Sequence, residues 1–180
     1  MGSEMATGTV PHFRVTAVGS LKQQPGCPEY VRQALSARRL DKLALGECYY
    51  PTDERYLVDR IEVVRIRPQV APEEPIAGLV EDVWRSIPCE PDPAGCSVEF
   101  SDAAFPQNGR DAIYYVRAIE EASTTINGGN LRPVYDEQGR VTAVNPCYGD
   151  YRIDSADDCQ VSLEHRAWSS PIFLTYDPGQ

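Results

Sequence analysis

The sequence predicts a protein built mostly of β-strands, and three observations support this prediction. The 180 residues include 13 glycines and 15 prolines, and this much turn chemistry suits short strands and loops better than a helical bundle. Several segments alternate apolar and polar residues, as half-buried strands do. Helical spacing is confined to one short segment. A chain of this length buries roughly 70% of its unfolded surface, which is enough for a core of its own.

The expected strands differ in how strongly the sequence marks them. We expect strands at residues 13–18, 60–67, 97–100, 111–120 and 166–176, and a hairpin from 131–135 and 140–144. Residues 60–67 carry apolar side chains on both faces, which is typical of a central strand. Residues 113–116 are four consecutive β-formers, the strongest strand signal in the chain.

Residues 28–45 have helical character. Pro28 suits the first position of a helix, and Val31, Ala34 and Leu35 follow at helical spacing. We expect one bent helix or two short ones, packed as an insertion on one end of the sheets. The fold expected is an Ig-like or fibronectin-like antiparallel β-sandwich with a short helical insert near residues 28–45. A single domain would cover residues 10–177, with its helical insert bounded by a disulfide at 27–48, and residues 1–9 would be a cloning remnant or a disordered lead.

The six cysteines indicate disulfides. No CxxC occurs, whereas structural zinc sites usually use two close pairs, so staples are favoured over metal binding or buried free thiols. Each sequential pair brackets a local unit, and we therefore expect the pairs Cys27–Cys48, Cys89–Cys96 and Cys147–Cys159. Such bonds imply an oxidising compartment, either the periplasm or the exterior.

The charge excludes some partners. A net charge of −10 and a pI near 4.7 oppose binding to nucleic acid or to anionic membranes. No apolar run approaches the ~18 residues that span a bilayer, so we expect no membrane insertion. The first residues also lack the basic start and apolar core of a signal peptide.

No residue pattern predicts catalysis. His165 lies between Glu164 and Arg166, but neighbours on a strand point to opposite faces, so a solvated strand start is the favoured interpretation. We therefore expect no catalytic residue. The acidic loop offers weak Ca²⁺ ligands but lacks the spacing of an EF-hand, and a solvated loop without a cofactor is favoured. Its carboxylates are Asp150, Asp154, Asp157 and Asp158.

Aromatic residues could stack on sugar rings, but alternation along strands favours core positions. The candidates are Tyr114, Tyr115, Tyr135, Tyr148, Tyr151, Trp84 and Trp168. We expect Trp168 to anchor the core against the strand of Tyr114 and Tyr115. Arg117 should share a face with Tyr115 and either stack on it or pair with a carboxylate. Pro171 should bend the last strand or place it at a sheet edge.

Three sequence blocks resemble a family of exported bacterial proteins. They are Pro11–Val18, Val58–Arg65, and Tyr114–Ile119 together with Arg166–Ile172. The resemblance is to a C-terminal β-sandwich that follows a larger part similar to the PHP (polymerase and histidinol phosphatase) metal-hydrolase fold. It implies a non-catalytic accessory module that packs on, or flanks, an N-terminal PHP-like catalytic region. The clustered His and Asp/Glu ligands of such hydrolases are missing here, because the chain has only His12 and His165. The alternative is an independent extracellular module that binds glycan or calcium.

Overall fold

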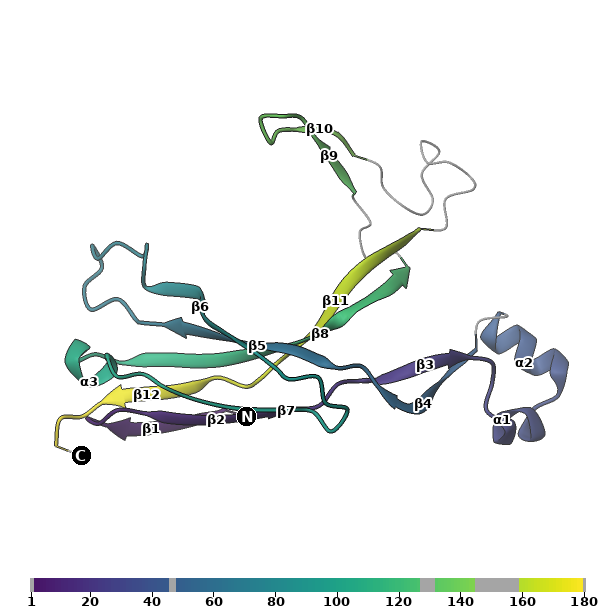
Figure 1. Cartoon of the computed structure of the whole chain (residues 1–180), viewed down its shortest axis with the longest axis horizontal. Coiled ribbons are helices and arrows are strands. Elements are labelled where there is room, and N and C mark those ends of the chain that lie inside the picture. The colour runs from purple at the N-terminus through teal and green to yellow at the C-terminus, as the bar shows by residue number, and fades with distance from the viewer. Residues whose placement is uncertain (1, 46–47, 127–131, 145–158, 180) are drawn as a thin grey trace. The chain divides into compact units, whose positions relative to one another are not determined.

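A computed structural model describes residues 2–45, 48–126, 132–144 and 159–179. It is mostly β, with several antiparallel sheets and few helices, consistent with the β-sandwich-like fold that the sequence predicts (Figure 1). The helices are α1 (Glu29–Ala34), α2 (Ala37–Ala44) and α3 (Phe105–Asn108). The strands are β1 (Ser3–Thr7), β2 (His12–Ala17), β3 (Leu21–Pro25), β4 (Tyr49–Arg55), β5 (Val58–Ile66), β6 (Val80–Pro88), β7 (Cys96–Ser101), β8 (Ala112–Ile126), β9 (Pro133–Tyr135), β10 (Val141–Val144), β11 (Gln160–Trp168) and β12 (Ile172–Tyr176).

The largest sheet has the order β1-β12-β8-β5-β6, and β11 also pairs with β8. Strand β5 is central, as its two apolar faces predict. It pairs antiparallel with both β6 and β8, and Val63 lies opposite Val116 of β8. The side chains of Ile61, Val63 and Val64 are completely buried.

A second layer is the antiparallel β2–β7 pair, which runs in register from His12–Ser101 to Ala17–Cys96. Its apolar side packs on the large sheet. Phe13 of β2 stacks on Phe100 of β7 with a centroid distance of 4.8 Å, and it meets Tyr114 of β8 at the same distance. The sandwich core therefore forms between β2–β7 and β8.

The chain divides into two compact units, residues 1–120 with 168–180, and residues 121–167. The second unit contains the antiparallel hairpin of β9 and β10, which confirms the hairpin expected from sequence. The first boundary lies in β8 directly after Glu120, the last residue of β8 that pairs with β5, and the second lies in β11 directly before its final residue, Trp168.

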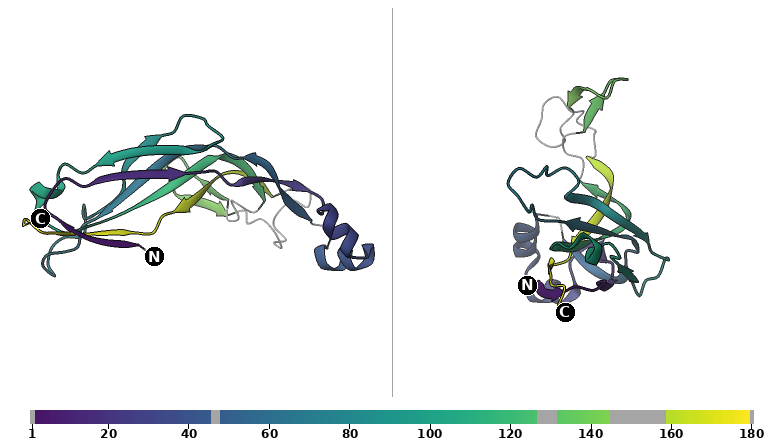
Figure 2. Two further views of the ribbon diagram at one scale, coloured as in Figure 1. Left: turned by 90° about the horizontal axis from the view of Figure 1, so that it is seen from below. Right: turned by 90° about the vertical axis from the view of Figure 1, so that its left-hand side faces the viewer.

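The start of the chain corrects one expectation. Residues 3–7 form β1 and pair in parallel with β12, from Ser3–Ile172 to Thr7–Tyr176, so they are not the disordered lead that was one of the two alternatives expected for residues 1–9. The other alternative, a cloning remnant, stays a prediction. The two strands lie side by side in both views (Figure 2). The side chains of β1 are largely exposed, so backbone pairing rather than an apolar pattern places this strand.

The end of the chain also differs from the expected single strand at 166–176. Strand β11 ends at Trp168 and β12 begins at Ile172, so the strand is interrupted at Pro171, where a bend was expected. The edge position is wrong for β12, because it lies between β1 and β8.

Candidate functional site

The helical insert is closed at its base by a disulfide. The Cys27–Cys48 bond brings the two Cα atoms to 5.0 Å, and the backbone N–H of Gly26 donates a 2.7 Å hydrogen bond to the carbonyl of Cys48. Strands β3 and β4 pair just before and after these cysteines. We call α1, α2, this disulfide and the adjoining residues Leu45 and Tyr49 the helical tip.

Local chemistry explains why the tip contains two short helices. Helix α1 begins after Pro28, whose carbonyl accepts hydrogen bonds from Val31 and Arg32. Helix α2 begins after Ser36 and ends at Ala44, and the next residue, Leu45, adopts a left-handed conformation with φ of 50°. The N–H of Leu45 still donates to the carbonyl of Asp41 at 2.8 Å. Of the two alternatives expected from the sequence, one bent helix or two short ones, the structure has the second.

The expected packing of this insert on the sandwich is wrong. Neither α1 nor α2 has a buried residue. Four large apolar side chains are instead exposed: Tyr30 (73%), Leu43 (64%), Leu45 (82%) and Tyr49 (60%). Helices of six and eight residues are too short to bury a broad apolar stripe by themselves. Ala37, Leu40 and Ala44 line a groove of about 390 Å³ with Pro25 and the disulfide.

The tip also reverses the charge of the chain. Residues 28–45 contain four basic residues, Arg32, Arg38, Arg39 and Lys42, and two acidic ones, Glu29 and Asp41. Their net charge is therefore +2 in a chain of net charge −10. Several exposed apolar side chains beside cationic groups are typical of a docking surface.

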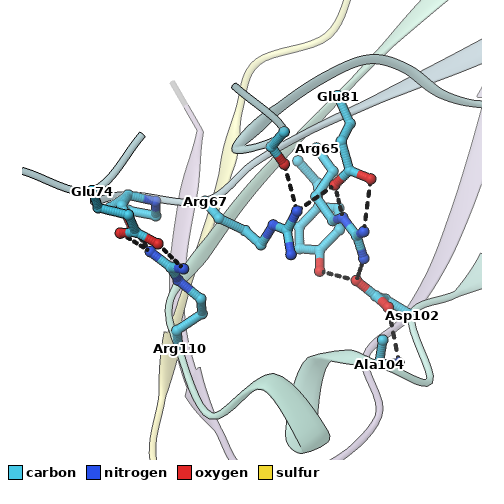
Figure 3. Close-up of polar contacts among 10 residues, drawn as sticks. Arg65, Arg67, Glu74, Glu81, Asp102, Ala104 and Arg110 are labelled. Carbon is cyan, nitrogen blue, oxygen red and sulfur yellow. Dashed lines mark hydrogen bonds and ion pairs between the residues drawn. The ribbon is translucent and has the colours of Figure 1, made fainter. Parts of the chain in front are cut away.

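The buried polar groups of the sandwich have a structural role. The Arg65 guanidinium binds both Glu81 oxygens, at 2.6 and 3.0 Å, and donates to Asp102 at 2.6 Å (Figure 3). The Tyr114 hydroxyl donates to the same Asp102 at 2.7 Å, and the N–H of Ala104 donates to its other oxygen at 3.0 Å. Every oxygen of this carboxylate has a partner, so the network ties β5, β6 and β8 to Asp102, the residue that follows β7.

Its protonation states fit a structural role. Burial opposes the ionisation of Asp102, but hydrogen bonds from Tyr114 and Arg65 outweigh it and hold the pKa of Asp102 below its usual value. Burial and the neighbouring Asp102 raise the pKa of Tyr114 far above its usual value. Neither group is poised to exchange a proton near neutral pH.

The positions of Tyr114 and Arg117 agree with the sequence predictions. Tyr114 is 1% exposed and belongs to the core. Arg117 pairs with Glu62 at 2.9 Å and with Asp82 at 2.5 Å, which confirms that it meets carboxylates. Tyr115 is half-buried.

Trp168 is a correction, because 60% of its side chain is exposed and it is no core anchor. Strand β11 ends there, and the next residue makes the close contact with β8. Ser169 donates its N–H to the carbonyl of Val116 at 2.9 Å, and its hydroxyl accepts the N–H of Val116 at 3.0 Å.

Of the other aromatic candidates, one belongs to the core and one is exposed. Trp84 packs against the core cluster, as expected. Tyr135 is 59% exposed, so its expected core position is wrong; it lies on a hairpin strand with no buried residue. Tyr148 and Tyr151 lie outside the described residues.

The candidate polar sites give no reactive arrangement among the described residues. His165 is exposed and lies 3.0 Å from the Thr125 hydroxyl through Nε2. Within the described ranges, no group of three or more His, Cys, Asp or Glu side chains is placed to hold a metal ion. The weak Ca²⁺ candidates, Asp150, Asp154, Asp157 and Asp158, lie outside those ranges, so the calcium hypothesis stays a prediction.

Two of the three expected disulfides are present. Cys89–Cys96 closes the loop between β6 and β7 with a Cα separation of 5.8 Å, alongside Cys27–Cys48 at the tip. Cys147 lies outside the described residues, so the Cys147–Cys159 pair stays a prediction. Two disulfides favour an oxidising, extracellular-type environment. In the described part of the chain, no helix is long and apolar enough to cross a membrane.

Sequence reasoning missed the Arg65–Asp102 network and the exposure of the tip. One local signal for Asp102 existed, because an Asp two residues before a backbone N–H often accepts from it, as Asp102 does from Ala104. For the tip, the less regular spacing of Leu43 and Leu45 was the signal. No family model, curated protein or solved structure matches this chain.

Proposed function

We propose that this chain is a non-catalytic accessory β-sandwich module of an exported PHP-like metal-dependent hydrolase, and that it docks on the catalytic region through the helical tip. The sequence blocks that resemble the C-terminal sandwich of such proteins support the parent. The β-rich fold and two disulfides support an exported, Ig-like or fibronectin-like module.

The exposed apolar surface of the tip is the observation that carries the proposal. Four large apolar side chains are each at least 60% exposed: Tyr30, Leu43, Leu45 and Tyr49. A disulfide at the base reduces the freedom that the tip would lose on docking, which favours binding. The charge of +2 at residues 28–45 calls for a partner face that is apolar and acidic.

Trp168 supplies a second contact in this proposal. Tryptophan is enriched among the residues that dominate protein interfaces, and this one leaves 60% of its side chain open to a partner.

Hydrogen exchange in the natural full-length protein tests the docking. Amides of residues 29–44 should exchange more slowly there than in the isolated chain. Replacing Leu43 and Leu45 with Glu should remove that protection, whereas Val70→Glu, at a 75% exposed loop position, should leave it unchanged. Equal exchange in both proteins, or a natural gene without a metal-ligand pattern upstream, would refute the proposal.

Catalysis is tested separately. The isolated chain should hydrolyse no phosphoester substrate when supplied with divalent metals. Turnover that survives repurification and is lost in His165→Ala would show that the chain is itself an enzyme.

The alternative function is an independent extracellular module that binds glycan or calcium. One observation favours a ligand-binding module: a groove formed by β2, β7 and Arg85, whose lining is mostly polar and also includes Phe13 and Phe100. A signal peptide directly before Val10 in the natural gene would favour this alternative over the accessory module.

A further inference from the structure

A groove of about 490 Å³ lies where the β2–β7 pair meets Arg85 of β6. Its polar lining residues are His12, Arg14, Arg85, Glu99 and Ser101. The register pairs His12 with Ser101 and Arg14 with Glu99, so these four side chains share the sheet face opposite to Phe13 and Phe100. We call this surface the Arg85 groove.

Arg85 is held in place by stacking. Its guanidinium carbon lies 4.3 Å from the centre of the Trp84 ring. That ring also contacts the Arg65 guanidinium at 4.4 Å, and it packs edge-on against Phe100 with centroids 6.2 Å apart. Because Arg65 is fixed by Glu81 and Asp102 (Figure 3), the buried network holds the surface on which Arg85 lies.

Arg85 has no carboxylate partner among the described residues, whereas Arg60 and two further arginines of the same sheet do. Arg65 and Arg117 are both ion-paired on it. The Arg85 guanidinium makes a cation–π contact with Trp84 and donates no hydrogen bond to another described side chain or carbonyl, so its N–H groups are available to a ligand. Those donors match the paired oxygens of a carboxylate, sulfate or phosphate group.

A second guanidinium in the groove is only loosely held. Arg14 approaches Glu99 at 3.8 Å, and the two side chains are 73% and 76% exposed. An exposed pair at this distance contributes little, so Arg14 can turn toward a ligand at small cost. Ser101 adds a hydroxyl donor at the same end as His12.

We propose that the Arg85 groove binds an oxyanion, that is, a carboxylate, sulfate or phosphate group. The Arg85 guanidinium donates hydrogen bonds to two oxygens of this group, and Arg14 and Ser101 supply further donors. The two arginines that line the groove face one carboxylate, Glu99, so the lining is net positive in a chain of net charge −10. The proposal is independent of docking through the helical tip.

Fluorescence of Trp84 offers a direct readout, because Arg85 stacks on it and Trp168 is the only other tryptophan. The Trp168→Phe variant would be titrated with sulfate, phosphate and glucuronate at constant ionic strength, with glucose and chloride as negative probes. We expect saturable binding with a dissociation constant of about 1 mM or tighter for at least one oxyanion. Sulfate, phosphate and glucuronate show whether the groove prefers a sulfate, a phosphate or a carboxylate group.

Calorimetry of variants assigns the site, since Arg85→Ala itself alters the Trp84 signal. Arg85→Ala should weaken binding about tenfold or more, and Arg85→Lys should also weaken it because the planar fork is lost. Arg166→Ala, at an exposed arginine outside the groove, is the matched control and should bind like the parent protein.

Amide chemical shifts complete the test. Perturbations should cluster at residues 12–14, 85 and 99–101. The proposal is overturned by the absence of saturable binding, by equal affinity in Arg85→Ala, or by shifts confined to residues 32–42, which would assign the anion to the helical tip.

Discussion

Tyr114 donates its hydroxyl hydrogen bond to the same oxygen of Asp102 that receives a hydrogen bond from Arg65, at 2.7 and 2.6 Å. One carboxylate thus joins a core residue of β8 to a buried cation of β5. Asp102 itself is 2% exposed. Such a shared acceptor makes the three residues depend on one another, because each removal leaves a buried polar group without its partner.

Asp102→Ala should therefore be strongly destabilising. We expect a loss of about 3–5 kcal/mol in the free energy of unfolding, since Arg65 and the Tyr114 hydroxyl both lose a buried partner. Tyr114→Phe should cost less, about 1–3 kcal/mol. Urea denaturation measures both. Asp59→Ala is the control, because Asp59 pairs with Arg60 at the surface, 55% exposed, and should cost under about 1 kcal/mol. A loss in Asp102→Ala no larger than this control would contradict the structural role.

Acid should weaken the fold through depressed carboxylate pKa values. The pKa of Asp102 lies below its usual value, and the hydrogen bond from Arg110 lowers the pKa of Glu74 to about 2. Such groups stabilise the fold fully above their unfolded pKa values of about 4, and this stability is lost as pH falls toward the folded values.

Denaturation midpoints measured from pH 7 to 2 test this dependence. They should be level down to about pH 5 and fall below about pH 4. The fall should be shallower in Asp102→Asn, which removes one of the titrating groups. Identical profiles in the two proteins would show that Asp102 contributes nothing to the acid transition.

Truncation of the two tryptophans should have different effects on stability. Trp84→Ala removes a ring packed on Phe100 and Tyr114 and stacked by Arg65, so we expect a cost of about 3 kcal/mol or more. Trp168→Ala should change the unfolding midpoint little, because the side chain is 60% exposed. Equal costs for the two variants, measured by denaturant melts, would place Trp168 in the core.

The two disulfides should also differ in their effects. Cys96 is 7% exposed and packs with Val58 and Ile61, so replacing Cys89 and Cys96 with Ser should lower the free energy of unfolding of the whole domain by about 2–4 kcal/mol. Replacing Cys27 and Cys48 should mainly loosen the tip. Trypsin should then cut at residues 32–42 before the sheets unfold. Faster cleavage elsewhere, with the tip unchanged, would contradict this division.

Non-reducing peptide mapping would test the third pair. It should recover Cys147 and Cys159 in one linked peptide. Free thiols at these positions would leave the oxidising compartment supported by two disulfides alone.

Features that depend on local interactions were predicted from the sequence, whereas those that depend on distant residues were not. Strand β5 was predictable because Ile61, Val63 and Val64 show its burial directly in their residue types. The Cys27–Cys48 and Cys89–Cys96 bonds were predictable because each closes a local loop. Strand β1 was not, since its pairing with β12 depends on backbone groups 169 residues away and its side chains are exposed.

The sequence by itself determined the β-rich class, the short helical insert and the first two disulfides, because these depend on local propensity, alternation and loop closure. Only the tertiary structure decided that Trp168 faces outward, that Arg65, Glu81 and Asp102 meet inside the sandwich, and that Arg85 is left stacked on Trp84 without a carboxylate partner among the described residues. Those outcomes depend on which strands become neighbours. Residue type sets what a side chain can bind, whereas the pairing of distant strands sets what it meets.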